Sequence, residues 1–287
     1  MEPIPVIPFR WSIEKRQELG SLIDFIKVDL PPGFHEELVA SSARILAFAG
    51  EAQLYFVGRS PENYFDFLSG AFEEVVELKD RINLFQFSGS RYTYELLARE
   101  HQFELEHLRA YMRTIGLSPT QIIGRKIGTT LVDVVYGGGT FRMLVELIHD
   151  WARDEKVSWP AVCDKLRIVG ITERTKNSPN TWRWQQQADW IELLGSARVK
   201  NVSVEGWFWR YIANYQSKST DSYHPARWAN PTAEQPYRAL YNREGLKIAV
   251  SLYDYGTQSA TREALRQAMT AQLEMREAWF RGYVKCL

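Results

Sequence analysis

The chain has 287 residues, 45% of them hydrophobic and 24% charged, which is enough apolar material for one large core. Lys plus Arg and Asp plus Glu both number 35, so no net charge attracts the chain to nucleic acid or to an acidic membrane. The two cysteines, Cys163 and Cys286, do not make the disulfide framework of a small secreted domain. The sequence has no signal segment and no apolar run of about 18 residues, so we expect a cytoplasmic protein without a membrane partner.

Hydrophobic periodicity predicts alternating helices and strands in the first half of the chain. Apolar residues recur at helical spacing before Gly50 and again after Asn63. The run from Leu54 to Val57 is wholly apolar, as expected of a parallel strand that is covered on both faces. The predicted elements are a helix over 35–48, a strand over 54–57, a helix over 64–76, a strand over 82–87 and a long helix over 94–115.

The second half of the chain contains the clearest strand-loop-helix unit. The predicted elements are strands over 131–135, 166–172, 199–204 and 246–252, a helix over 140–153 and a closing helix over 260–283. This alternation favours an α/β fold with a mostly parallel sheet and helices on both faces. Tryptophans concentrate between residues 182 and 228, which indicates an aromatic-rich cap. We therefore divide the chain into an N-terminal helical segment (1–50), an α/β core (51–205) and a C-terminal cap with the closing helix packed on the core (206–287).

A glycine-rich loop follows the predicted strand at 131–135. Consecutive glycines let the backbone adopt positive φ and turn several N–H groups toward one anion, and the next helix adds its positive end. Asp133 would face the same pocket, where it could accept hydrogen bonds from sugar hydroxyls or hold a hydrated Mg²⁺. Alternatively, the glycines only permit a tight turn and Asp133 is a solvated or capping residue. The residues expected around the anion are Tyr136, Gly137, Gly138, Gly139 and Thr140.

The spacing in this segment resembles the signature of the phosphoribosyltransferase family. That signature has an apolar strand, two adjacent acidic residues, and then a hydroxyl residue, Gly, any residue and Thr before a helix. Counted back from Thr140, Gly138 falls on the signature glycine and Asp133 on the second acidic position. Val132 stands where the first acid is expected, and Gly137 replaces the usual hydroxyl residue.

The resemblance implies a phosphoribosyltransferase-like fold and an enzyme of nucleotide metabolism. Such an enzyme uses phosphoribosyl pyrophosphate (PRPP) with Mg²⁺ and transfers the pentosyl group to an acceptor, releasing pyrophosphate. In that family the acidic pair engages the ribose hydroxyls of PRPP. Since Val132 replaces one acid, the alternative is a regulatory protein that binds PRPP or ribose 5-phosphate without reaction. A third hypothesis is a methyltransferase that uses S-adenosylmethionine, because an apolar strand followed by Asp and glycines also occurs in that class.

Two further loops match positions that this family uses. Arg59 and Ser60 follow the strand at 54–57, where the family places its pyrophosphate loop, and Arg59 offers a planar fork of donors. The alternative is a helix start in which Ser60 is the N-cap and Arg59 is solvated. The loop over 120–130, with Arg125 and Lys126, corresponds to the mobile catalytic loop of the family, or else it is a surface connection.

The aromatic segment offers flat surfaces on which an acceptor ring could stack, although packing explains most buried tryptophans. Four basic residues of that segment would suit a phosphate, or they face water. The histidines and cysteines show no spacing typical of a zinc site. The acceptor and the oligomeric state stay open, although sheets of this class often pair as homodimers. The four basic residues are Arg183, Arg210, Lys218 and Arg227.

Overall fold

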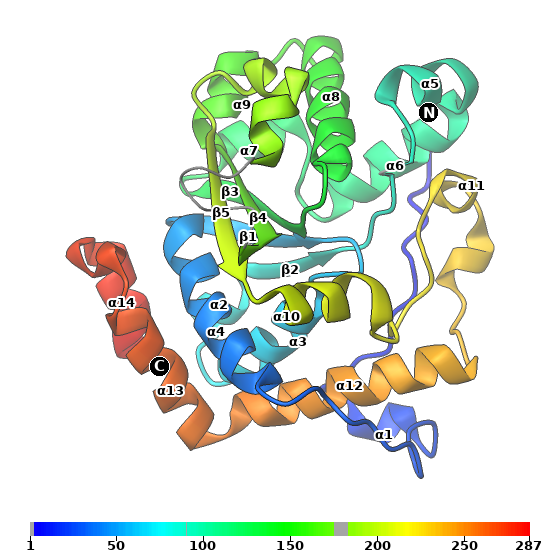
Figure 1. Cartoon of the computed structure of the whole chain (residues 1–287). Helices are drawn as coiled ribbons and strands as arrows, with labels where there is room; N and C mark the ends of the chain where they lie inside the picture. The colour runs from blue at the N-terminus through cyan, green and yellow to red at the C-terminus, as the bar shows by residue number, and fades with distance from the viewer. Residues whose placement is uncertain (1–2, 90, 175–182) are drawn as a thin grey trace.

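The computed structural model describes residues 3–89, 91–174 and 183–287 (Figure 1). Trp182 of the aromatic segment lies outside the described residues. Five strands form one parallel sheet in the order β2-β1-β3-β4-β5, so the expected α/β fold is confirmed. The strands are β1 (Ala52–Val57), β2 (Ile82–Phe85), β3 (Gly128–Val134), β4 (Leu166–Glu173) and β5 (Arg198–Val204).

Helices cover both faces of the sheet (Figure 1). One face carries α5 (Tyr94–Glu100), α6 (Gln102–Thr114), α7 (Pro119–Gly124), α8 (Gly139–Asp154) and α9 (Trp159–Lys165). The other face carries α2 (Phe34–Ala49), α3 (Glu62–Ala71), α10 (Gly206–Arg210), α13 (Ser259–Thr270) and α14 (Ala278–Cys286). Outside α3 lies α12 (Leu240–Thr257), and the remaining short α-helices are α1 (Arg16–Leu19), α4 (Val76–Lys79) and α11 (Pro225–Trp228).

The two-sided burial explains why the central strands are almost wholly apolar. Successive side chains of a strand point to opposite faces. Tyr55 and Leu131, which are paired in the sheet, belong to the cluster under α6 and α8. Phe56 and Val132, the next pair, belong to the cluster under α2 and α3. Neither face is left to solvent, so both sets of positions require apolar residues.

The predicted strand over 246–252 is wrong, because these residues lie in the middle of helix α12. A short apolar run does not distinguish a buried strand from a buried helix. Here the run is buried on two sides, since Leu252 packs toward the sheet and Val250 packs toward the N-terminal segment. The helix also crosses α3 very closely at Gly70. A Cβ on Gly70 would lie 2.1 Å from the carbonyl oxygen of Tyr253.

Three predicted helices end or break earlier than their apolar spacing indicates. The helix expected over 94–115 is two helices, because the backbone leaves helical geometry at His101 (φ −132°, ψ 37°). The helix expected over 64–76 ends at Ala71. The closing helix is interrupted between Thr270 and Ala278, where the chain forms a short 3₁₀ turn.

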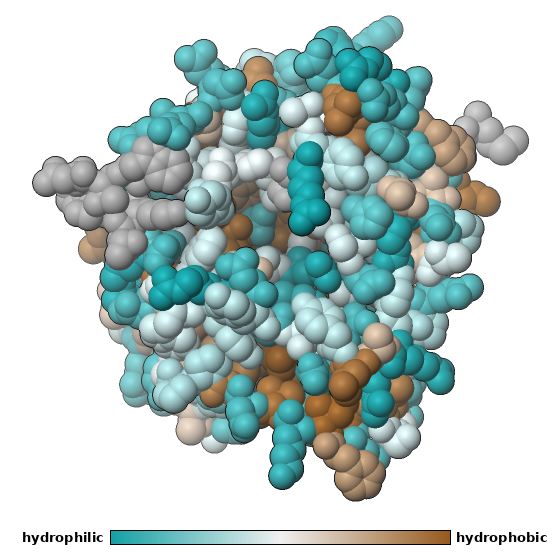
Figure 2. All heavy atoms as spheres, turned by 45° about the vertical axis from the view of Figure 1, so that its right-hand side comes forward, coloured by the Kyte–Doolittle hydropathy of each residue, from teal (hydrophilic) through white to brown (hydrophobic). Residues whose placement is uncertain are grey.

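The tryptophans of the aromatic segment serve mainly as core residues. Trp184, Trp190 and Trp228 are buried in the cluster that also holds α6 and α8. Residues from all three predicted divisions of the chain share the opposite cluster, for example Phe34 and Phe280. In the described part of the chain no helix is long and apolar enough to cross a membrane. The face seen in Figure 2 is mostly hydrophilic, with an apolar area near its lower edge.

Candidate functional site

A cavity of about 730 Å³ lies at the carboxyl ends of β1 and β3. From β1 the chain continues to β2 on one side, and it then returns to β3 on the other side. The loops after β1 and β3 therefore diverge at this point, which is where open parallel sheets bind ligands. Both loops that the sequence indicated, the one after β1 with Arg59 and Ser60 and the one after β3, line this cavity.

The glycine loop needs a glycine at one position for steric reasons. Gly138 has φ +82°, and a Cβ there would lie 2.6 Å from Cε3 of the buried Trp184. Gly137 has no atom within 4 Å of an added Cβ and no positive φ. Gly138, which falls on the glycine of the family signature, is thus the position where the backbone requires a glycine. Helix α8 begins directly after it.

The backbone N–H groups from Gly137 to Phe141 lie at the start of α8, where the Phe141 residue itself is fully buried. None of them donates a hydrogen bond to the backbone or to a side chain in the described parts of the chain. The first N–H group that pairs is that of Arg142, which donates to the carbonyl oxygen of Gly138 at 2.9 Å. Unpaired amides at a helix start, together with the positive end of the helix dipole, form an anion site. Residues Tyr136 to Thr140 line the cavity at this place.

Asp133 lies at the end of β3 on the side of the cavity and is only 6% exposed. Its Oδ1 accepts a hydrogen bond from the Val134 N–H at 2.7 Å. Burial raises the pKa of Asp133 to about 7, and the bonds from Val134 and from the side chain of Thr140 oppose that rise. The carboxyl group therefore stabilises its own loop and also lines the cavity. Asp133 is thus both a capping residue and a residue of the candidate ligand site.

Arg59 and Ser60 line the cavity from the loop that follows β1. Arg59 donates from Nη1 to the carbonyl oxygen of Thr220 at 3.3 Å. Ser60 does not cap α3, since the N-cap residue is Pro61 and no side chain bonds the helix start. The capping role considered for Ser60 is therefore wrong, and Ser60 lines the cavity.

A third wall of the cavity comes from residues 216–220, which sequence reasoning did not identify. Gln216 and Lys218 both line the cavity, and Lys218 is only 4% exposed. Lys218 donates from Nζ to the carbonyl oxygen of Ile212 at 2.7 Å. Burial lowers the pKa of Lys218 to about 8, so its ammonium group is mostly charged at neutral pH. The only hint in the sequence was the basic character of Lys218 within the aromatic segment.

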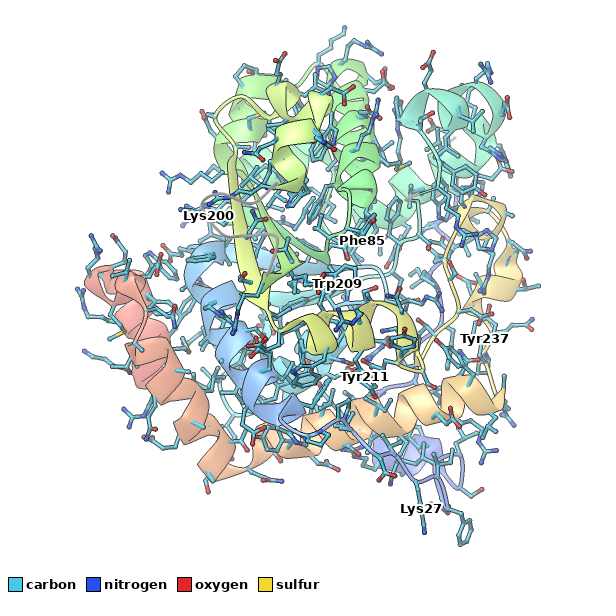
Figure 3. All side chains as sticks on the ribbon, in the orientation of Figure 1. Lys27, Phe85, Lys200, Trp209, Tyr211 and Tyr237 are labelled. Carbon is cyan, nitrogen blue, oxygen red and sulfur yellow. The ribbon has the colours of Figure 1, made fainter. Side chains whose placement is uncertain are left out.

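Three aromatic side chains that are at least partly exposed line the cavity, and we call them the aromatic rim. Tyr136 is largely exposed, and its ring centroid lies 6.3 Å from that of Trp209 on α10. The indole N–H of Trp209 donates to the carbonyl oxygen of Ile171 at 3.2 Å, which fixes the ring beside the end of β4 (Figure 3). Tyr241, at the start of α12, completes this rim. The rim offers flat surfaces close to the anion site.

Arg125 and Lys126 are not part of this arrangement. They precede β3, so they lie at its amino end, about 20 Å along the strand from Asp133. Arg125 is engaged there, with Nη1 donating to Thr129 at 2.9 Å and Nη2 to the Tyr55 hydroxyl at 2.8 Å. Much of the expected loop over 120–130 is helix α7 and the beginning of β3. The geometry therefore separates these two residues from the ligand space.

Of the four basic residues in the aromatic segment, Lys218 is the one that reaches the cavity. Arg210 pairs with Glu173 at 3.0 Å, and Arg227 pairs with Asp221 at 3.4 Å. Both ion pairs are partly exposed, which agrees with the alternative that these basic residues face water.

The cavity does not supply the ligands of a protein-held magnesium ion. Within the described cavity lining Asp133 is the one carboxylate, and no group of three His, Cys, Asp or Glu side chains is suited to a metal among the described residues. Mg²⁺ prefers several oxygen ligands and near-octahedral geometry. Asp133 alone does not fit that requirement, so a metal would have to arrive with a phosphorylated ligand.

Comparisons with protein families, with curated proteins and with solved structures find no match for this chain.

Proposed function

We propose that the cavity binds a phosphorylated pentose and that the chain is a pentosyltransferase that uses PRPP. The observation that carries the proposal is the set of unpaired N–H groups from Gly137 to Phe141 at the start of α8, beside the cavity. Such amides hold a phosphate monoester without any special side chain. The cavity volume of about 730 Å³ is in the range of sites for small metabolites.

The other walls fit the rest of such a donor. With the 5-phosphate on the glycine loop, the carboxyl group of Asp133 is placed to accept hydrogen bonds from ribose hydroxyls. Arg59 and Lys218, which line the same cavity, would provide two cations for the diphosphate. In the transfer, the acceptor forms a bond to the anomeric carbon as the bond to the diphosphate oxygen breaks. The electron pair leaves with the diphosphate, whose charge the two cations stabilise.

One observation favours a second candidate, a protein that binds the donor without transferring the pentosyl group. The first acidic residue of the family signature is replaced by Val132, which is fully buried on the α2 and α3 side of the sheet. No neighbouring carboxylate lines the described part of the cavity in its place. Ribose binding then depends on Asp133 alone, which reduces the hydrogen bonds that position the sugar for reaction.

Calorimetry together with a pyrophosphate-release assay tests the proposal. We expect PRPP and ribose 5-phosphate to bind, and pyrophosphate to be released with one member of a broad acceptor panel. Asp133→Ala should abolish turnover without unfolding the chain, and turnover like that of the wild type would rule out the assigned role. Binding without release over the whole panel would favour the second candidate. Saturable binding of S-adenosylmethionine, with no binding of PRPP, would favour a methyltransferase.

A further inference from the structure

A second cavity, of about 410 Å³, lies along the outer edge of the sheet. One wall is strand β2 together with Gln86, and another is the N-terminal segment over 7–14. In Figure 1 this segment, in dark blue, runs past the sheet on the side of β2. No described residue lines both this cavity and the one at the carboxyl ends of β1 and β3, which we now call the main cavity. The volume is in the range of sites for small ligands.

The outer edge of β2 presents backbone groups without a backbone partner. Phe85 faces β1, because its carbonyl oxygen accepts a bond from the Gly58 N–H at 2.8 Å. Successive residues of a strand direct their N–H and C=O groups to opposite edges, so those of Leu84 point away from β1. Among the described residues no strand pairs with this edge, and no backbone group beyond the sheet bonds Leu84. Leu84 therefore offers a donor and an acceptor side by side at the wall of the second cavity.

The lining also contains buried polar atoms without a partner. Gln86 is only 6% exposed, and its amide nitrogen donates to the Pro8 carbonyl oxygen at 3.3 Å. Its Oε1 has no hydrogen-bond partner among the described residues, and neither has Nε of Arg10. An unsatisfied buried polar atom costs free energy, so we expect a ligand or a water molecule to supply the missing partners.

The second cavity has no uncompensated charge. Its described lining contains two charged residues, Arg10 and Glu14. Arg10 pairs with Asp66 at 2.6 Å, and Glu14 pairs with Lys79 at 2.9 Å. An ion that enters such a cavity loses its water without gaining an opposite charge. The second cavity therefore favours a neutral ligand, in contrast to the main cavity with Arg59 and Lys218.

Three aromatic rings line the second cavity, those of Trp11, Phe65 and Tyr111. The Trp11 ring is held in place by Phe9, which lies edge-on at a centroid distance of 5.1 Å. Its indole N–H also donates to the Tyr237 carbonyl oxygen at 3.5 Å. Fixed aromatic rings bury the faces of a flat ligand.

We propose that the second cavity binds a small neutral ring that carries a hydrogen-bond donor beside an acceptor, as the base adenine does. The acceptor of the ring would receive the Leu84 N–H, and its donor would bond the Leu84 carbonyl oxygen. A second donor, or a water molecule that the ring holds, would satisfy Oε1 of Gln86. The faces of the ring would pack against Trp11 and Phe65. This proposal does not depend on the function of the main cavity.

An NMR titration of isotope-labelled protein with adenine tests the proposal. We expect the Leu84 amide resonance to shift downfield in a saturable manner and the indole N–H resonance of Trp11 to shift with it. Ribose 5-phosphate, which is an anion, should leave both resonances unchanged. If adenine does not change the Leu84 resonance, or changes only the amides from Gly137 to Phe141, the proposal is overturned.

Variants on two walls of the second cavity identify the contacts. Trp11→Leu should weaken adenine binding at least about fivefold, as expected from the loss of stacking on one base. Gln86→Met removes the amide at similar size and should weaken it at least about tenfold. Wild-type affinity in both variants would overturn the proposal, and if Gln86→Met does not fold, Trp11→Leu decides.

Gln53→Met is the matched control. Gln53 lies on β1 outside both cavities, and its amide donates to the Asp80 carbonyl oxygen at 2.7 Å, so adenine affinity should not change. A loss as large as that of Gln86→Met would indicate a general effect on the sheet and would also overturn the proposal. Benzoate, a charged ring without the neighbouring donor, should bind at least about tenfold more weakly than adenine. Equal affinity would refute the neutral class of ligand.

Discussion

Asp133 is a carboxylic acid whose protonation is changed by folding. Burial raises its pKa from 3.8 to about 7, so between those values the folded chain holds a proton that the unfolded chain releases. The folded state is thus favoured at the acidic end of this window, and the free energy of unfolding falls as the pH rises through it. Under the proposed function, ribose hydroxyls would donate hydrogen bonds to this carboxyl group and favour its ionised form.

Asp133→Asn should remove this pH dependence. We expect the stability of the variant relative to the wild type to increase by about 2 kcal/mol between pH 5 and pH 8, as the wild-type carboxyl group ionises. Urea unfolding at the two pH values measures the difference, and subtraction cancels other titrating groups such as Asp66. A relative stability that does not change with pH would contradict the assigned burial of Asp133.

Gly138 and Gly137 provide a matched pair for the loop itself. Gly138→Ala puts a Cβ against Trp184 at positive φ, so we expect a loss of about 1 to 3 kcal/mol in stability and weaker ribose 5-phosphate binding. Gly137→Ala meets no atom within 4 Å, and its unfolding free energy should stay within about 0.5 kcal/mol of the wild type. Equal stability of the two variants in thermal unfolding would show that the loop is not constrained as described.

At the scale of elements, the wall over 216–220 is fixed by the contact between α3 and α12. Asn63 of α3 and Gln216 exchange amide hydrogen bonds, and Asn242 of α12 donates to the Lys218 carbonyl oxygen at 3.3 Å. A Cβ on Gly245 would lie 2.1 Å from the Lys218 carbonyl carbon, so the wall lies directly on the helix backbone. The position of Lys218 therefore depends on how closely these helices pack.

Gly70→Ala tests that dependence. The added Cβ would lie 2.1 Å from the Tyr253 carbonyl oxygen, so the helices must separate, and we expect a loss of about 1 to 3 kcal/mol in unfolding free energy. Pyrophosphate affinity should fall as well, because the wall moves with α12. Gly124→Ala in α7, where an added Cβ has no neighbour within 4 Å, is the control and should retain both properties. Full stability and affinity in Gly70→Ala would disprove the close crossing.

The sequence predicted those elements whose pattern is local. The strand over 54–57 and the glycine loop after 131–135 were found because a parallel sheet requires apolar runs and a tight turn requires glycine. The helix at 246–252 was mistaken for a strand, since its burial on two sides removes the helical periodicity. The wall over 216–220 has no periodic pattern, and its polar residues are buried by partners about 150 residues away in the chain.

At the scale of the whole molecule, a chain without net charge has a cavity with a local excess of positive groups. The described lining contains Arg59, Lys218 and the amides at the start of α8. Its one carboxylate is that of Asp133. Under the proposed function, such a site would bind a small anion although the chain as a whole has no net charge to attract nucleic acid. Under the proposed function, the amides at the start of α8 form one anion position and Arg59 with Lys218 forms a second, so a ligand with two phosphate groups should bind more tightly than one with a single group.

Lys218→Met should therefore distinguish the anion position at the start of α8 from the one formed by Arg59 and Lys218. We expect pyrophosphate affinity to fall at least about tenfold, the effect of removing one buried charge partner, while ribose 5-phosphate affinity changes less than about threefold. Calorimetry with both ligands measures the two affinities. An equal loss for both ligands would indicate that Lys218 supports the cavity as a whole and does not define a second anion position.

The most direct test of the account is an NMR titration of isotope-labelled protein that follows the backbone amides of Gly137 to Phe141. With ribose 5-phosphate, we predict that these resonances shift downfield in a saturable manner, and that ribose without phosphate leaves them unchanged. If they stay unchanged while ribose 5-phosphate saturates the protein, the phosphate binds elsewhere and the central claim is wrong.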